Sequence, residues 1–116
     1  MPFQFGPEAR LSDRKDFGRV FSAGRKIVGK SLIIWRLETR SNRPPRLGLS
    51  MSTKVGNSVR RNRLKRLTRE TFRLNNSRLK KGLDLVVYFR QGCPWKGQAD
   101  AQNEIFGLWE RGGMLA

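Results

Sequence analysis

The chain has 116 residues, a length that suits one domain with a modest hydrophobic core. It carries 25 Lys and Arg against nine Asp and Glu, and this net charge of +16 opposes compaction and predicts a polyanionic partner. A single cysteine excludes an internal disulfide scaffold, no apolar run is long enough for a transmembrane helix, and the first residues lack the apolar core of a signal peptide, so we expect a cytoplasmic protein.

A helix is predicted over residues 13–23. Ser12 can accept a hydrogen bond from the first turn of this helix, and Gly24 is a natural stop at its other end. Phe17 and Phe21 are one turn apart, so the helical period places both rings on one face. Packing into the core would explain that face, and so would contact with an unstacked base of a nucleic acid. The helix by itself leaves both alternatives open.

Three strands are expected after this helix. A short strand is expected near residues 25–28, and residues 31–39 combine the β-branched and aromatic side chains that strands favour. Residues 41–45, SNRPP, form a turn. Residues 46–53 alternate clearly between two faces. One face carries Leu47, Leu49 and Met51, and the other carries the small residues Gly48, Ser50 and Ser52.

A long basic helix, a buried strand and a final helix complete the chain. The basic helix covers residues 59–73 and is capped by Asn57 or Ser58. Residues 83–89, LDLVVYF, read as a strand that is buried on both faces, and the final helix covers about 98–111. The sequence shows no repeats and no linker that would separate domains. We therefore expect one domain over 1–116, with its core at about 10–111 and a short N-terminal arm at 1–9.

The basic helix, VRRNRLKRLTRETFR, concentrates seven cations among fifteen residues, with Glu70 as its only acid. Like charges spaced by four residues destabilise an isolated helix. Six of the seven cations are arginines, whose planar guanidinium donates two parallel hydrogen bonds to a phosphate. A helical wheel places the core-facing stripe at Leu64, Leu67, Thr71 and Leu74, away from most of the cations.

Nucleic acid is the partner that this helix favours. Most charged helix faces are simply solvated, but such faces usually mix Glu with Lys, and here the acids are almost absent. A membrane-surface helix needs apolar residues that are free of the core, whereas the apolar residues here are assigned to the core. Helices that read DNA commonly belong to helical domains, while this chain is rich in strands. We therefore expect RNA, and neither DNA nor a membrane.

Protein-borne catalysis is not expected. The chain contains no histidine, which excludes a histidine general base, a Cys–His nucleophile and a histidine-ligated metal. Asp13 and Asp16 are three residues apart and could suggest a pair of metal ligands. Acids in the first turn of a helix are more simply explained by the helix dipole. We predict no catalytic residue, no metal site and no cofactor bound by the protein alone.

The segment RLGLSMSTKVGNSVRRNRLKRLTRETF resembles the signature region of the bacterial ribonuclease P protein subunit, and RLSDRKDFGRVFSAG resembles the first helix of that family. The resemblance covers about residues 10–90, while the C-terminal WERGGMLA matches only loosely. Ser58 departs from the small apolar residue that is common at its position. The Arg-Asn-Arg hallmark falls on Arg61, Asn62 and Arg63, and the basic positions that follow it fall on Lys65, Arg66 and Arg69.

The resemblance implies an α+β fold in the order α-β-β-β-α-β-α, a two-layer sandwich with a left-handed β-α-β crossover around the basic helix. Most crossovers are right-handed, so the sequence pattern alone would not have suggested this. The resemblance also implies that the RNA subunit and its Mg²⁺ ions, held by RNA, hydrolyse a phosphodiester and release the 5′ leader of precursor tRNA. The protein would then work in the bacterial cytoplasm as part of this ribonucleoprotein endonuclease.

Two groups of residues are predicted to contact RNA. The basic helix is expected to bind the catalytic RNA, and a cleft between the first helix and the strand 46–53 is expected to bind the leader. A structural RNA-binding protein of the ribosomal type is the alternative, since the basic helix fits both. The first group is Arg60, Arg61, Asn62, Arg63, Lys65, Arg66, Arg69 and Arg73; the second is Phe17, Phe21, Ser50, Ser52 and Lys54.

Overall fold

The computed structural model describes residues 10–11 and 13–116 of the chain. The predicted arm at 1–9 and the predicted cap Ser12 lie outside these residues. The order of elements matches the prediction, including the short strand after the first helix. The elements are α1 (Arg14–Ala23), β1 (Arg25–Val28), β2 (Leu32–Glu38), β3 (Arg46–Met51), the 3₁₀ helix η2 (Thr53–Val55), α2 (Ser58–Asn75), the 3₁₀ helix η3 (Asn76–Arg78), β4 (Leu83–Phe89) and α3 (Gln98–Arg111).

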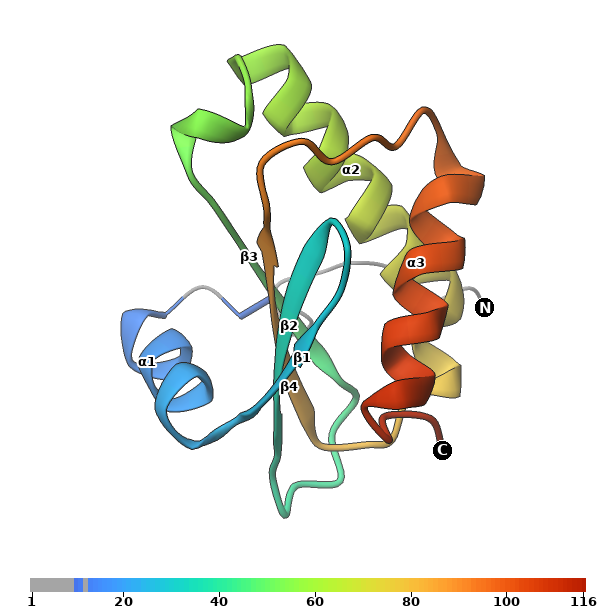
Figure 1. Cartoon of the computed structure of the whole chain (residues 1–116). Helices are drawn as coiled ribbons and strands as arrows, with labels where there is room; N and C mark the ends of the chain where they lie inside the picture. Colours follow the sequence, from blue (N-terminus) through green and yellow to red (C-terminus); the bar gives the residue numbers. More distant parts are fainter. Residues whose placement is uncertain (1–9, 12) are drawn as a thin grey trace.

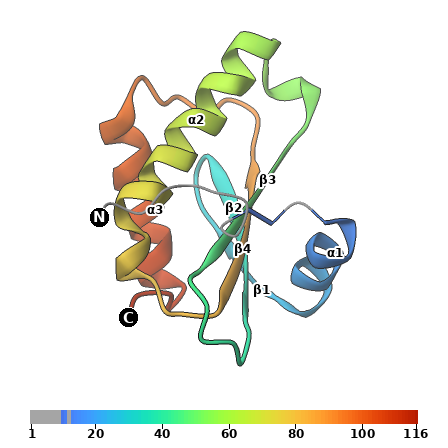
Figure 2. The same ribbon diagram turned by 180° about the vertical axis from the view of Figure 1, so that it is seen from behind.

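The four strands form one mixed sheet in the order β1-β2-β4-β3. The pairs β1–β2 and β2–β4 are antiparallel, whereas β3 and β4 are parallel neighbours joined through α2. Helices α2 and α3 cover one face of the sheet, and α1 lies on the opposite face (Figures 1 and 2). The sheet and the layer formed by α2 and α3 make up the predicted two-layer sandwich. Helix α1 covers part of the opposite face of the sheet. The left-handed sense of the crossover stays a prediction.

Each face of the sheet has its own hydrophobic cluster. The larger cluster lies between the sheet and α2 and α3, and β4 is buried along almost its whole length, as its apolar run predicts. The smaller cluster lies under α1 and consists of Leu11, Val20 and Val86, with three partly buried residues around them: Phe17, Trp35 and Leu37. Val20 is the one residue of α1 that is fully buried, so α1 is attached to the sheet by little apolar surface.

The core-facing stripe of α2 differs from the helical-wheel prediction. Leu64 and Thr71 are buried as expected, but Thr68 and Phe72 complete the stripe, whereas Leu74 is 51% exposed. The stripe is therefore rotated toward Phe72. The helical-wheel prediction left out Thr68, whose hydroxyl donates to the Leu64 carbonyl at 3.0 Å and therefore needs no water when it is buried.

The helix ends are determined by local hydrogen bonds and close contacts. The described N-cap of α1 is Asp13, whose carboxylate accepts from the Lys15 backbone N–H at 2.9 Å. Asn57 caps α2 as one of the two predicted residues. Gly24 ends α1 with an extended backbone and not in the left-handed region. It is required there because a Cβ would lie 2.8 Å from the Arg36 carbonyl oxygen.

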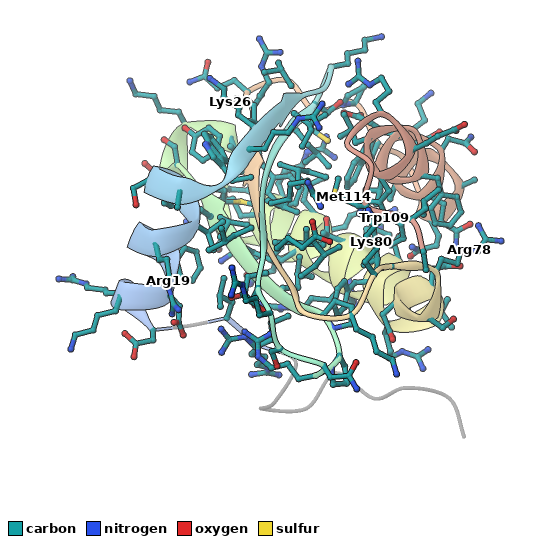
Figure 3. The ribbon with its side chains drawn as sticks, turned by 90° about the horizontal axis from the view of Figure 1, so that it is seen from below. Arg19, Lys26, Arg78, Lys80, Trp109 and Met114 are labelled. Carbon is teal, nitrogen blue, oxygen red and sulfur yellow. The ribbon has the colours of Figure 1, made fainter. Side chains whose placement is uncertain are left out.

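The C-terminal segment packs beside the end of α2. The backbone N–H of Lys80 donates to the Met114 carbonyl at 2.9 Å, and the N–H of Met114 donates to the Trp109 carbonyl at 3.0 Å. Figure 3 shows these three residues on the side of the sheet that holds α2 and α3, while Arg19 projects from α1 on the other side. Trp109 is 2% exposed and belongs to the larger hydrophobic cluster. Among the helices of the described chain, none is both long and apolar enough to span a membrane.

Candidate nucleic-acid interface

Three arginines in the first turns of α2 donate to backbone carbonyls. Arg60 donates to the carbonyl of Cys93, and Arg63 Nη2 donates to that of Lys96 at 2.6 Å. Arg61 Nε donates to the Gly56 carbonyl at 3.1 Å. These bonds attach α2 to the segment before it and to the segment between β4 and α3. Each guanidinium has five N–H donors, so each keeps donors that are available for an RNA phosphate.

At the other end of α2, Arg73 is paired with Glu70. Arg73 Nε lies 3.1 Å from Glu70 Oε2, and a second hydrogen bond joins Nη2 to Oε1. The hydrogen bonds from Arg73 hold the pKa of the Glu70 carboxyl below its ordinary value. The only acid of α2 therefore neutralises its last cation, and the exposed positive charge of the helix ends near Arg69.

The middle of α2 presents polar groups that have no partner within the described part of the protein. Asn62, Lys65, Arg66 and Arg69 make no side-chain hydrogen bond and no ion pair with any other described residue. Burial lowers the pKa of the Arg69 guanidinium, and the nearby charge of Arg10 lowers it further. Cations that repel one another at short range are stabilised by a bound anion. This part of α2 is therefore the strongest candidate for a phosphate-binding surface.

Two hollows flank this surface. One, of about 560 Å³, runs along the exposed side of α2; its lining residues are Val59, Asn62, Arg63, Arg66, Arg69 and Glu70. The other, of about 310 Å³, lies between α1, β3 and α2 and is called here the Phe17 cleft; its lining residues are Arg10, Leu11, Phe17, Leu47, Gly48, Leu49, Lys65 and Arg69. Arg69 contributes to both hollows.

The Phe17 cleft joins an aromatic ring, a glycine and two cations of α2. Phe17 lies directly over Gly48, because a Cβ at position 48 would come within 2.6 Å of the ring atom Cζ. The face of β3 that carries the small residue Gly48 therefore borders α1, in the place where a cleft between the first helix and this strand was predicted. Lys65 and Arg69 reach the same cleft from the other side. The cleft offers a flat apolar wall beside positive charge, the combination that suits a single-stranded nucleic acid.

The other residues that were predicted for a leader cleft do not line this hollow. Phe21 is 39% exposed and packs against Trp35, with ring centroids 4.9 Å apart. Ser52 accepts a hydrogen bond from the Lys54 backbone N–H at 3.1 Å, so it caps η2, and the Lys54 side chain is exposed there. Ser50 lies further along β3, in register with Tyr88 of β4.

Phe21 belongs to a row of four aromatic rings that was not predicted from the sequence. Phe17 and Phe21 have centroids 6.3 Å apart, and Trp35 follows Phe21. Tyr88 comes next, 6.4 Å from Trp35. Both Trp35 and Tyr88 are only partly buried. This aromatic row (Phe17, Phe21, Trp35 and Tyr88) runs from α1 across the sheet. Alternation along β2 and β4 could have assigned each ring to a face, but only the strand order shows that the faces coincide.

The acids of α1 are engaged in local contacts. Asp13 caps the helix, and Asp16 pairs with Arg19 and lies 3.6 Å from Arg46. Within residues 10–11 and 13–116, no three acids, cysteines or histidines come close enough together to hold a metal ion. Cys93 is buried, and burial raises the pKa of its thiol above the ordinary value, which disfavours the reactive thiolate.

Comparison with known proteins identifies the family. The family model described as Ribonuclease P matches residues 5–113. The ribonuclease P protein component of Clostridium acetobutylicum is 36% identical over 93% of this chain and 92% of its own length. The chain shares its fold with the solved structure of the RNase P protein from Staphylococcus aureus, to which it is 26% identical with a TM-score of 0.84; the match covers 93% of this chain and 98% of that one. It also shares its fold with the RNase P protein from Thermotoga maritima, to which it is 29% identical with a TM-score of 0.79; the match covers 88% of this chain and 96% of that one. The chain therefore belongs to the ribonuclease P protein family.

Proposed function

We propose that this protein is the subunit of ribonuclease P that binds the catalytic RNA through α2 and the 5′ leader of precursor tRNA through the Phe17 cleft. The observation that carries the proposal is that two cations of α2 lie in the same cleft as an aromatic wall. Lys65 and Arg69 reach the cleft that Phe17 closes, in a chain that belongs to the ribonuclease P protein family. The protein thereby forms part of an endonuclease of tRNA maturation.

The exposed side of α2 is the proposed site for the catalytic RNA. Arg66 and Asn62 line its hollow and are exposed. A guanidinium can hold a phosphate with two hydrogen bonds, and an amide can bond a base or a ribose hydroxyl. Arg60, Arg61 and Arg63 would add contacts through their remaining donors while they keep α2 in place.

The leader is proposed to lie as an extended strand along the Phe17 cleft. A base can stack against Phe17, while Lys65 and Arg69 meet the phosphates on either side of it. The leader can continue along the aromatic row toward Trp35 and Tyr88. Ser50 is partly exposed beside Tyr88, and Lys54 can reach a phosphate beyond the end of β3. Mature tRNA has no leader and would not use this surface.

The chemistry is proposed to belong to the RNA subunit. The chain has no histidine, and the acids of α1 are occupied by a helix cap and by arginines. Mg²⁺ ions held by the RNA would activate water and stabilise the leaving oxygen. The protein would supply positive charge and hold the leader, in the cytoplasm of a bacterium where precursor tRNA is processed.

This assignment predicts that the protein's acids are dispensable for the cleavage step. Asp13→Ala, Asp16→Ala and Glu70→Ala should each leave single-turnover cleavage at saturating precursor within about tenfold of the wild-type rate, since none of them would hold a catalytic metal. Rates are measured on complexes whose assembly has been checked by gel shift. A loss of about a thousandfold in one folded, assembled variant would place a metal site on the protein and contradict the assignment.

The function itself is tested by reconstitution. Purified protein is added to ribonuclease P RNA and precursor tRNA at a magnesium concentration too low for the RNA to act efficiently alone. We expect the protein to stimulate cleavage at the leader junction, because its cations reduce repulsion between the two RNAs. Binding to the RNA without stimulation at any magnesium concentration would instead support a structural RNA-binding protein of the ribosomal type.

A further inference from the structure

Helix α1 is attached to the sheet by few apolar contacts. Val20 alone is fully buried, and Phe17 is only partly buried over Gly48. The chain just before the helix is fixed by a hydrogen bond from Leu11 N to the Leu47 carbonyl at 2.9 Å. Within the described chain, α1 is the only helix on its side of the sheet (Figures 1 and 2). The orientation of α1 therefore depends strongly on its polar contacts.

A buried ion cluster lies at the end of the sheet beneath α1. The Asp84 carboxylate is only 1% exposed and accepts two hydrogen bonds from Arg46, Nε to Oδ1 and Nη2 to Oδ2, both at 2.9 Å. Arg43 Nη2 lies 3.2 Å from the same carboxylate. The hydrogen bonds to Asp84 raise the pKa of Arg46. This bidentate pair holds the Arg46 guanidinium in a fixed orientation across β3 and β4.

The third nitrogen of the same guanidinium points toward α1. Arg46 Nη1 lies 3.6 Å from Asp16 Oδ2, and both side chains are about four-fifths buried, with 20% and 18% of their area exposed. Asp16 directly precedes Phe17 in the helix. A rigid cation on the sheet is thus joined to the residue beside the ring that closes the cleft.

We propose that the Arg46–Asp16 bridge is a positioning device for leader binding: it fixes α1 on the sheet so that the Phe17 ring stays over Gly48 and the cleft keeps its width. Neither side chain lines the Phe17 cleft, so both act through Phe17. The inference rests on the proposed function, since it assigns the leader to that cleft. Arg46 is the anchor held by Asp84, and Asp16 is the contact that α1 makes with it.

The test replaces Asp16 by Asn, which keeps the shape of the side chain and removes its charge. Asp13→Asn is the matched control on the same helix, because Asn can still accept the capping bond from Lys15 N. Affinities of the reconstituted complex are measured for precursor and mature tRNA. We expect Asp16→Asn to weaken precursor binding by about two- to fivefold, the range of a partly exposed ion pair, and to leave mature tRNA binding unchanged. Asp13→Asn should change neither affinity.

A second readout needs no RNA. Trp95 and Trp109 are each 2% exposed, whereas Trp35 is partly exposed and contacts Phe21 of α1, so acrylamide quenches mainly Trp35. Loosening of α1 in Asp16→Asn should increase this quenching, while the melting temperature shows that the protein remains folded. Increased quenching together with a reduced precursor preference supports the proposal.

The outcomes separate this inference from the proposed function. If the wild-type complex prefers precursor over mature tRNA and Asp16→Asn keeps that preference in full, the positioning role is overturned, whatever the quenching shows. Equal loss of both affinities would also overturn it, because the bridge would then act on general RNA binding. If the wild-type complex itself shows no preference for precursor, the leader cleft fails, and the quenching experiment still decides whether the bridge holds α1.

Discussion

Replacing Lys65, Arg66 and Arg69 together by Ala is expected to weaken binding of the protein to the catalytic RNA loaded with precursor tRNA, and to make the salt dependence of this binding shallower by about 2–3 units of log Kd per log salt concentration. Arg66 would lose a phosphate of the catalytic RNA, and Lys65 and Arg69 would lose phosphates of the leader. These three side chains make no hydrogen bond and no ion pair with any other described residue, so their removal breaks no polar contact within the described part of the fold. The expected result is a folded protein with an unchanged circular dichroism spectrum. Binding is measured by filter retention over a series of salt concentrations.

A charge-matched control decides whether position or total charge matters. Arg25, Lys30 and Lys81 are exposed and lie outside α2, and replacing all three by Ala removes the same net charge. We expect this variant to keep a slope close to that of the wild type. Equal reductions of the salt-dependence slope in both triple variants would show that RNA binding depends on the net charge of the protein. The assignment of the RNA surface to α2 would then be wrong.

Phe17→Ala is expected to weaken binding of precursor tRNA by roughly five- to a hundredfold, the effect of losing one stacking platform. Binding of mature tRNA should stay the same, because it has no leader to lie in the Phe17 cleft. Both affinities are measured with the assembled complex, after the melting temperature of the variant has been compared with that of the wild type. Phe21→Ala tests in the same way whether the leader follows the aromatic row.

The matched control is Phe106→Ala on α3, since Phe106 is also a partly buried aromatic residue but packs against Trp109 on the other face of the sheet. It should leave the preference for precursor unchanged. If Phe17→Ala reduced both affinities equally, or neither, the ring would not be a leader platform. A variant that unfolds would identify Phe17 as a core residue, the alternative that its packing over Gly48 also allows.

Much of the fold could be predicted because its signals are local. The alternation in β3 depends on a period of two residues and correctly separated Leu47 from Gly48. The position of α2 followed from its cap and its helical period, although its core-facing stripe is rotated toward Thr68 and Phe72 and away from Leu74. Each of these features involves residues that are close in the chain, where propensity and period are informative.

The site could be predicted only in part because its remaining features connect distant segments. Arg60 and Arg63 bond to carbonyls 33 residues further along the chain, and no pattern in the sequence indicates that these segments meet. Trp35 and Tyr88 join the aromatic row because β4 lies next to β2 in the sheet. The pairing of Arg73 with Glu70, by contrast, follows from their spacing of three residues.

The most direct test of the account is photo-cross-linking of a precursor tRNA that carries a photoreactive uridine analogue in its leader. The precursor is bound to the assembled complex and irradiated, and the attached peptides are identified by mass spectrometry. We expect attachment within α1 and β3 and at Lys65 or Arg69. An excess of unlabelled precursor should remove these products, whereas the same excess of mature tRNA should leave most of them. Attachment confined to α3 or to the C-terminal segment would contradict the proposed path of the leader.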